Sequence, residues 1–128
     1  MEISKKDLET TNTTIVSIGN QKNEKTGKVA GNIELDIENQ TVFTETINTI
    51  FESKKSNIIL DMSLISYIDS SGLWALFEGH KKAEKQNSHL VLINPTKDVQ
   101  RVLNITKMSS KMKVVTNQKE AIRFLETK

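Results

Sequence analysis

The sequence predicts an α/β fold: a mostly parallel sheet of about five strands with an antiparallel N-terminal strand, covered by about four helices. Short apolar or β-branched runs alternate along the chain with longer segments whose apolar residues recur at helical spacing. In addition, the apolar runs at residues 58–61 and 64–68 lead through the polar turn Asp69-Ser70-Ser71-Gly72 into such a helical segment. A strand that enters a helix through a tight turn is typical of parallel sheets, whose sites lie at the carboxyl edge.

The composition excludes several kinds of function. The 128 residues suit one domain with a substantial core. The absence of cysteine excludes disulfides, a thiol nucleophile and a thiolate metal site, and the two histidines, His80 and His89, show no metal-ligand pattern. With 18 basic and 16 acidic residues the net charge is only +2, which argues against nucleic acid or a membrane as the main partner.

We expect a cytoplasmic protein without a cofactor. No apolar run approaches the ~20 residues of a membrane span, and residues 1–6 lack the core of a signal peptide. The sequence also has no Gly-rich loop of the kind that holds nucleotide phosphates.

The N-terminal part is predicted to contain two strands and one helix. We expect residues 1–12 to form a flexible arm and residues 13–128 to form the domain. The β-branched run Thr13–Ile18 predicts a strand, and residues 28–33 predict a second strand antiparallel to it. A helix is predicted over residues 40–53, with its buried side formed by Val42 or Phe43 and by Ile47, Ile50 and Phe51.

A strand at Asn57–Asp61 is predicted next, and the polar turn then opens a helix that ends near Lys85. Steps of ~100° per residue place an apolar stripe on the inward side of this helix. Its members are Leu73, Leu76, Phe77, His80, Ala83 and Glu84. Trp74 falls on the flank of the stripe, where it would serve as a binding anchor or pack against the neighbouring helix.

The C-terminal part continues the alternation. Residues 89–93 predict a buried strand, and Thr96 is the expected N-cap of a short helix marked by Val99, Val102, Leu103 and Ile105. A polar turn over residues 106–111 leads to a last strand at residues 112–115. Thr116 and Asn117 are expected to cap a final helix that turns Ala121, Ile122 and Leu125 inward.

The turn at residues 69–72 has the chemistry of a helix start that a kinase can reach. Asp69 and Ser70 stand where a helix needs acceptors for its first free amides, and Gly72 lets another chain approach the backbone. A phosphate there would add about −1.5 to −2 charges at the positive end of the helix dipole. Such a change should alter partner binding rather than unfold the domain, whereas the simpler interpretation is an ordinary helix cap.

The chain resembles a STAS domain, and most closely a bacterial anti-sigma factor antagonist, across residues 13–125. The residues that carry the resemblance match in order and spacing. They are Ile58-Ile59-Leu60-Asp61, Tyr67-Ile68-Asp69-Ser70-Ser71-Gly72-Leu73, Leu90-Val91-Leu92, Val102-Leu103-Asn104-Ile105-Thr106 and Glu120-Ala121-Ile122. We therefore expect a STAS-like fold.

The resemblance implies a switch at Ser70, the first serine after the aspartate. In such antagonists a partner anti-sigma factor, which is a serine kinase, phosphorylates this serine. The unphosphorylated form binds the anti-sigma factor and frees the sigma factor, and a PP2C-type phosphatase restores it. The expected partner-binding residues are Asp36, Asp69, Ser71, Gly72 and Trp74.

The resemblance is less clear in two loops. The family has an acidic residue near the switch serine; without a gap Glu34 takes its place, and with two inserted residues Asp36 does, which we favour. A plain solvated acidic loop is a further possibility. After Ile105 many relatives have glycine, where this chain has the polar run at residues 106–110.

There are two alternatives to this function. The first is a STAS subunit that docks into a larger assembly, such as a lipid transporter, and is never phosphorylated. The second is an enzyme, which the sequence disfavours because Ser70 has no histidine at a motif spacing and neither histidine has a recognisable catalytic context.

Overall fold

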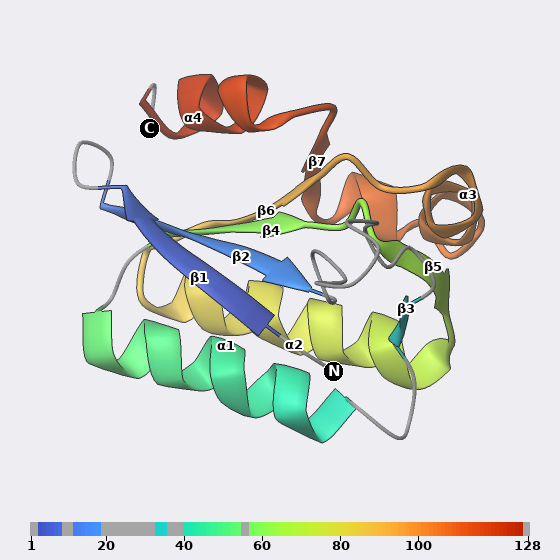
Figure 1. Cartoon of the computed structure of the whole chain (residues 1–128), viewed down its shortest axis with the longest axis horizontal. Helices are drawn as coiled ribbons and strands as arrows, with labels where there is room; N and C mark the ends of the chain where they lie inside the picture. Colours follow the sequence, from blue (N-terminus) through green and yellow to red (C-terminus); the bar gives the residue numbers. More distant parts are fainter. Residues whose placement is uncertain (1–2, 9–11, 19–32, 36–39, 55–56, 127–128) are drawn as a thin grey trace, which may run out of the picture.

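The computed structural model describes residues 3–8, 12–18, 33–35, 40–54 and 57–126 of the chain. Within them, a five-stranded sheet has the strand order β1-β2-β4-β6-β7 (Figure 1). Its strands are β1 (Ile3–Leu8), β2 (Thr13–Ile18), β4 (Asn57–Asp61), β6 (Leu90–Ile93) and β7 (Lys113–Val115). β1 is antiparallel to β2, and the other neighbouring pairs are parallel, which confirms the predicted fold class.

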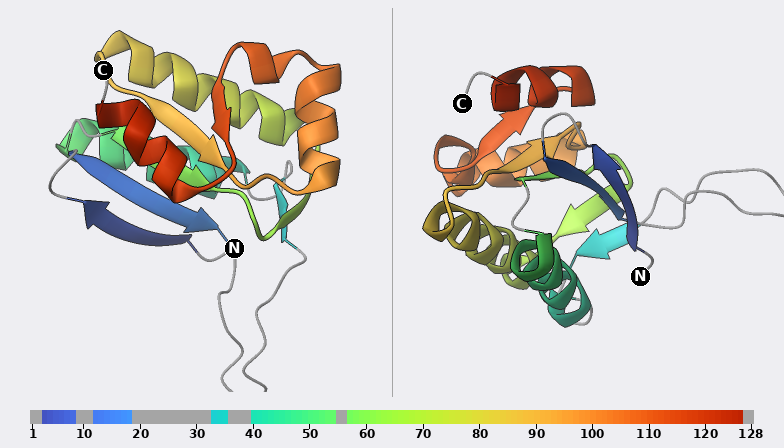
Figure 2. Two further views of the ribbon diagram at one scale, coloured as in Figure 1. Left: turned by 90° about the horizontal axis from the view of Figure 1, so that it is seen from above. Right: turned by 90° about the vertical axis from the view of Figure 1, so that its left-hand side faces the viewer.

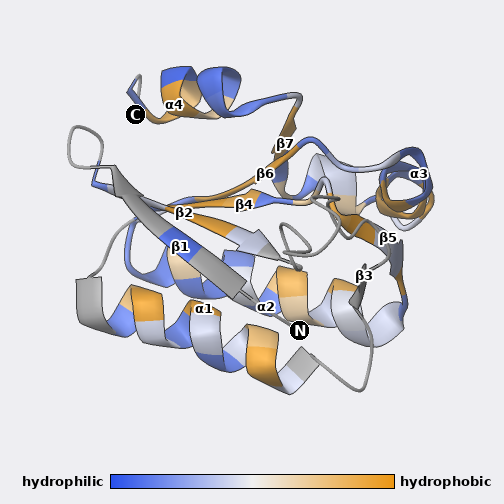
Figure 3. Cartoon of the chain, viewed as in Figure 1, coloured by the Kyte–Doolittle hydropathy of each residue, from blue (hydrophilic) through white to orange (hydrophobic). Residues whose placement is uncertain are grey.

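The centre of the sheet is formed by β4 and β6, which are hydrophobic along most of their length (Figure 3). Ile59 lies opposite Ile15 of β2 on one side and Val91 of β6 on the other. Continuous apolar runs of this kind are typical of parallel strands covered on both faces. The strand predicted at Asn57–Asp61 is confirmed at both ends.

Helices cover the sheet on both faces (Figure 2). α1 (Gln40–Lys54) and α2 (Ser70–Lys85) lie side by side on one face, and α4 (Gln118–Glu126) lies on the other. Gly79 lets α2 pack closely, because a Cβ atom there would lie 3.2 Å from Cδ2 of Leu90 and 3.5 Å from Cγ2 of Ile47. At the surface, Nζ of Lys82 donates to Oε1 of Glu52 at 2.8 Å and ties α2 to α1.

A second, two-stranded sheet lies beside the main one. It pairs β3 (Ile33–Leu35) with β5 (Ile65–Ile68) in parallel. The sequence predicted one strand between the first two helices, whereas the structure has two, and β5 rather than β4 leads into α2. α3 (Lys97–Ile105) packs against β5, and the hydroxyl of Thr96 donates to the carbonyl of Ile65 at 3.0 Å.

The prediction of a flexible arm over residues 1–12 was wrong for residues 3–8, which form β1. β1 pairs with β2 along its whole length, from Ile3 opposite Ile18 to Leu8 opposite Thr13. Because main-chain hydrogen bonds do not depend on side-chain type, a polar segment can form an edge strand. Exposed lysines such as Lys5 are common on edge strands.

The antiparallel partner of β2 is therefore β1, not the strand predicted at residues 28–33. Residues 28–32 lie outside the described residues, and Ile33 begins β3, which pairs with β5. The helix predicted over residues 40–53 is α1, and of its two alternatives for the buried side Phe43 is buried while Val42 is 49% exposed.

The C-terminal helices follow the expected pattern with one exception. Oγ1 of Thr96 accepts from the amide of Val99 at 3.4 Å and caps α3 as predicted. Oδ1 of Asn117 likewise accepts from the amide of Glu120 at 2.9 Å and caps α4. Ile105, placed on the apolar side of α3 by the sequence, is 72% exposed because it lies about 200° around the helix from the buried Leu103.

We expect Leu92→Ala to lower the free energy of unfolding by about 2–5 kcal/mol, because it leaves a cavity in a fully buried strand. Urea denaturation followed by circular dichroism measures the change. Ile105→Ala is the matched control, since it also truncates an aliphatic side chain but at an exposed site, and should cost about 0.5 kcal/mol or less. Equal losses in the two variants would contradict the assignment of β6 to the core.

Candidate functional site

The junction between β5 and α2 is a capped helix start. β5 ends at Ile68, and Asp69 follows with the extended dihedral angles φ −101° and ψ −174° that an N-cap residue adopts. Oδ1 of Asp69 accepts from the amide of Gly72 at 3.0 Å, and its carbonyl accepts from the amide of Leu73 at 3.0 Å. Both bonds fix the first turn of α2, so Ser70 is the first helical residue.

The first turn separates exposed from buried residues. Ser70 is exposed and Ser71 is half-buried, whereas Gly72 and Leu73 are buried. Of the two hydroxyls in the turn, that of Ser70 is thus the more accessible to another protein. Gly72 has no side chain and lies in the buried part of this turn.

Two large side chains near Ser70 are exposed to solvent. Trp74 follows Ser70 by four residues, so both lie on the same face of α2, and its side chain is 58% exposed. Its ring contacts Phe77 of the same helix, with ring centroids 6.1 Å apart. Tyr67, three residues before Ser70 in β5, is 52% exposed. A hydroxyl and two exposed aromatic rings together are typical of a protein-binding surface.

The electrostatics of this helix start suit a negative group. After Asp69 the first turn of α2 carries no acidic residue, while its last turn carries Lys82 and Lys85. The positive end of the helix dipole thus faces Ser70, where a phosphate gains about 0.3–1 kcal/mol from it. Negative charge added here costs the fold little.

Of the two acidic residues proposed near the switch, only Glu34 lies within the described residues. Asp36 lies outside the described residues, so its predicted role in partner binding stays a prediction. Glu34 lies in β3, whose backbone pairs Glu34 with Tyr67 and Leu35 with Ile68. The choice between Glu34 and Asp36 therefore stays open.

Tyr67 is an exposed residue of this surface that was not predicted from the sequence. There, Tyr67 is part of the apolar run at residues 64–68. Within β5 the buried residues are Ile65 and Ile68, and Tyr67 between them is exposed. No local signal marks it, because side chains alternate along a strand and Tyr67 would be expected on the same face as the buried Ile65.

Neither histidine is placed to activate Ser70. His80 lies ten residues further along α2, which corresponds to about 15 Å of helix. His89 lies directly before β6, beyond the end of α2. Among the described residues, no three His, Asp or Glu side chains are grouped in a way that would hold a metal ion.

The chain matches the family model of the STAS domain over residues 18–121. It belongs to the STAS domain family. Of the helices that the structure describes, none combines the length and the apolar character needed to cross a membrane.

Solved structures share this STAS fold. A Thermotoga maritima protein described as a "putative anti-sigma factor antagonist" has a TM-score of 0.77 at 21% identity, over 97% of this chain and 94% of its own. The Bacillus cell fate determinant SpoIIAA in its phosphorylated form has a TM-score of 0.65 at 19% identity, over 97% of this chain and 99% of its own. At these identities the likeness concerns the fold.

One curated relative is a much longer protein, "Probable sulfate transporter 3.4" of Arabidopsis thaliana. It is 49% identical over 51 residues, which make up 40% of this chain. The matched stretch spans 8% of the length of that relative.

Replacing the capping carboxylate should destabilise this STAS domain. We expect Asp69→Ala to lower the free energy of unfolding by about 0.5–2 kcal/mol, because the amide of Gly72 loses its acceptor. Asp69→Asn should retain most of the stability, since the amide oxygen can cap in the same way.

Asp98→Ala serves as the control in the same urea titration. Asp98 lies in the first turn of α3 and pairs with Arg101 at 3.4 Å, with both side chains largely exposed. A pair of this kind contributes about 0–1 kcal/mol. If Asp69→Ala were as stable as the unmodified domain, the cap would not be what fixes the start of α2.

Proposed function

We propose that this STAS domain is an anti-sigma factor antagonist that is switched by phosphorylation at Ser70. The observation that carries the proposal is the exposed Ser70 at the start of a capped helix, with the exposed Trp74 four residues on along the same helix and the exposed Tyr67 three residues before it in β5. The unphosphorylated domain binds an anti-sigma factor, which is a serine kinase, and the sigma factor is released. Such a function is exercised in the cytoplasm and needs no catalytic residue in this chain.

The switch works through charge at the surface. Phosphorylation adds about −1.5 to −2 charges next to Asp69. The fold tolerates this charge because Ser70 is exposed and the helix dipole is favourable there. A partner that covers Ser70 would remove the phosphate from water without supplying a positive charge to pair with it. Repulsion between like charges, or the loss of solvation, costs several kcal/mol at an interface. Phosphorylation therefore releases the partner and leaves the domain folded.

The partner surface is assigned around the first turn of α2. Trp74 supplies the large anchor, since exposed tryptophan side chains often carry much of the binding energy at interfaces. The half-buried Ser71 is part of the proposed contact, whereas Gly72 is buried and, through the bond from its amide to Asp69, helps to hold the turn in place. A PP2C-type phosphatase returns Ser70 to its hydroxyl form. A role for Asp36 at the same surface is part of the proposal.

The fold comparisons support this assignment at the level of architecture. SpoIIAA, which shares the fold, has been solved in a phosphorylated form, so this architecture accommodates the modification. The Thermotoga maritima protein of the same fold is described as a "putative anti-sigma factor antagonist".

We expect Ser70→Asp to weaken binding to the anti-sigma factor at least about tenfold, because a fixed charge replaces the hydroxyl within the contact. The free energy of unfolding should change by about 0.5 kcal/mol or less, as for other exposed surface changes. The measurements are titration calorimetry with the anti-sigma factor captured from the native cell, and urea denaturation.

Gln118→Glu is the control for added charge, because it places one negative charge on the exposed first residue of α4. This variant should bind like the unmodified domain. Ser70→Asp binding as tightly as Gln118→Glu would rule out the switch, and a large loss of stability in Ser70→Asp would assign any binding loss to the fold.

A second function is favoured by the relative named as a sulfate transporter, which is 49% identical over 51 residues. In this alternative the domain docks as a subunit of a larger assembly, such as a lipid transporter. The turn at residues 69–72 then serves as a contact surface and carries no phosphate.

Intact-mass spectrometry of the protein purified from its native cells distinguishes the two functions. The switch predicts a species heavier by one phosphoryl group that disappears on phosphatase treatment and is absent in Ser70→Ala. The docking function predicts a single unmodified mass before and after phosphatase, in cells grown under several stress conditions.

A further inference from the structure

The exposed face of α2 carries an apolar and basic stripe that begins beside Ser70. Its members are Trp74, Phe77 and Lys81, which come four, seven and eleven residues after that serine. At ~100° per residue, all of these positions lie within about 60° of one another around the helix. Trp74 and Lys81 are exposed, and Phe77 is half-buried. The stripe therefore continues the surface of the first turn for about 16 Å along α2.

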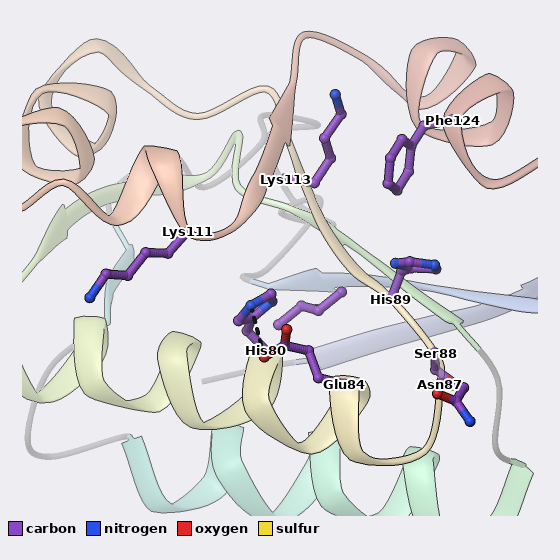
Figure 4. Close-up of a pocket in the computed structure, with 9 residues that line it drawn as sticks. His80, Glu84, Asn87, Ser88, His89, Lys111, Lys113 and Phe124 are labelled. Carbon is purple, nitrogen blue, oxygen red and sulfur yellow. Dashed lines mark ion pairs between the residues drawn. The ribbon is translucent and has the colours of Figure 1, made fainter. Parts of the chain in front are cut away.

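Two ammonium groups lie against one ring of this stripe. Nζ of Lys81 lies 5.6 Å from the ring centroid of Phe77. Nζ of Lys111, from the segment before β7, lies 5.5 Å from the same centroid. Figure 4 shows the side chain of Lys111 pointing along α2 toward its start, away from His89 and Phe124. Contact with a ring holds an ammonium group at an apolar surface without neutralising its charge. Two positive charges thus lie at one aromatic side chain.

Little negative charge opposes these two lysines. Among the described residues, neither of their ammonium groups forms an ion pair. Oε1 of Glu84 lies 3.4 Å from Nε2 of His80, a pair marked by the dashed line in Figure 4. Glu78, the other acidic residue of α2, precedes Lys82 by four residues and so lies on the flank nearer α1, where Lys82 bonds to Glu52. The far end of the stripe therefore has an excess of positive charge.

This combination of side chains fits a protein segment that carries acidic residues around an apolar one. Carboxylates would pair with the ammonium groups, and the apolar side chain would pack on the exposed indole ring of Trp74. Nucleic acid fits less well, because the whole chain has a net charge of only +2 and a weak attraction for a polyanion.

We propose that the partner of this surface binds the stripe through an acidic segment, whose carboxylates contact Lys81 and Lys111. The inference rests on the proposed function for the identity of the partner, an anti-sigma factor, but not for the chemistry of the surface. An acidic partner also strengthens the effect of the switch. A phosphate on Ser70 adds negative charge to the same face of α2, and this charge repels an acidic segment.

The first test is an NMR titration of the isotope-labelled domain with a peptide that carries one phenylalanine between two pairs of glutamates. The peptide should shift the indole signal of Trp74 and the amide signals of residues 77, 81 and 111. A matched peptide with glutamines in place of the glutamates should bind at least about tenfold more weakly, because it lacks the charge. An oligothymidylate of the same net charge is the nucleic-acid probe and should bind more weakly than the acidic peptide.

Two variants, each with two lysines replaced, make the test specific. Lys81→Gln/Lys111→Gln should weaken binding of the acidic peptide at least about tenfold. Lys97→Gln/Lys119→Gln is the control, because it removes the same charge at the exposed first turns of α3 and α4, and it should bind the peptide like the unmodified domain. Both variants should keep the thermal midpoint of the domain, since all four side chains are exposed.

The second test measures the association rate of the anti-sigma factor captured from the native cell. At low salt, Lys81→Gln/Lys111→Gln should associate at least about fivefold more slowly than the control variant. The difference should shrink as NaCl is raised to about 0.5 M, because salt screens charges at the surface.

Several results would overturn the proposal. With the peptides, they are equal binding by the two lysine variants, equal binding of the glutamate and glutamine peptides, signal shifts confined to other parts of the domain, or no shift at all. Binding of the oligothymidylate as tight as that of the acidic peptide would assign the stripe to nucleic acid instead. With the anti-sigma factor, the contrary result is an equal association rate for the two variants.

A failure of the switch gives a different result. In that case Ser70→Asp binds the anti-sigma factor as tightly as the unmodified domain, whatever the lysine variants do. If no anti-sigma factor is captured, the proposed function fails, and the peptide titration still decides whether the stripe binds an acidic segment.

Discussion

The hydrogen bond from the amide of Gly72 to the side chain of Asp69 determines where α2 begins, and most of the functional surface follows from that position. β5 ends at Ile68, so Asp69 alone separates the strand from the helix. With so short a junction, the residues of the first turn have fixed directions. Ser70 faces solvent, while Leu73 enters the core three residues later. A helix that began one residue earlier or later would rotate every side chain by ~100° and bury or displace the serine.

The rest of α2 keeps this start rigid. Leu76 and Ala83 are buried against the sheet side, and Gly79 allows close contact with both α1 and β6. Stability therefore resides on one face of the helix, and the exposed residues Ser70 and Trp74 lie on another. This division explains why a charge at Ser70 can change binding without large changes in folding: the modified group has few buried contacts to lose.

The parts of the fold that the sequence predicted are those with local signals. Asn57–Asp61 is a continuous apolar run, Thr96 and Asn117 are capping residues, and the start of α2 combines an acceptor with a helical pattern. β1 was not predicted because its residues are mostly polar and it is held by main-chain hydrogen bonds to β2. Pairing with another strand leaves no pattern in the sequence of β1 itself. The separate sheet of β3 and β5 was missed for the same reason, and with it the exposure of Tyr67.

Phe77 lies in the middle of α2, between the rings of Trp74 and His80. Its ring lies 6.1 Å from that of Trp74 and 6.5 Å from that of His80, and the ammonium groups of Lys81 and Lys111 lie within 5.6 Å of it. A partner that binds Trp74 would press on this ring. Because the buried face of α2 is closely packed, such a contact would act through these side chains and not through a shift of the helix.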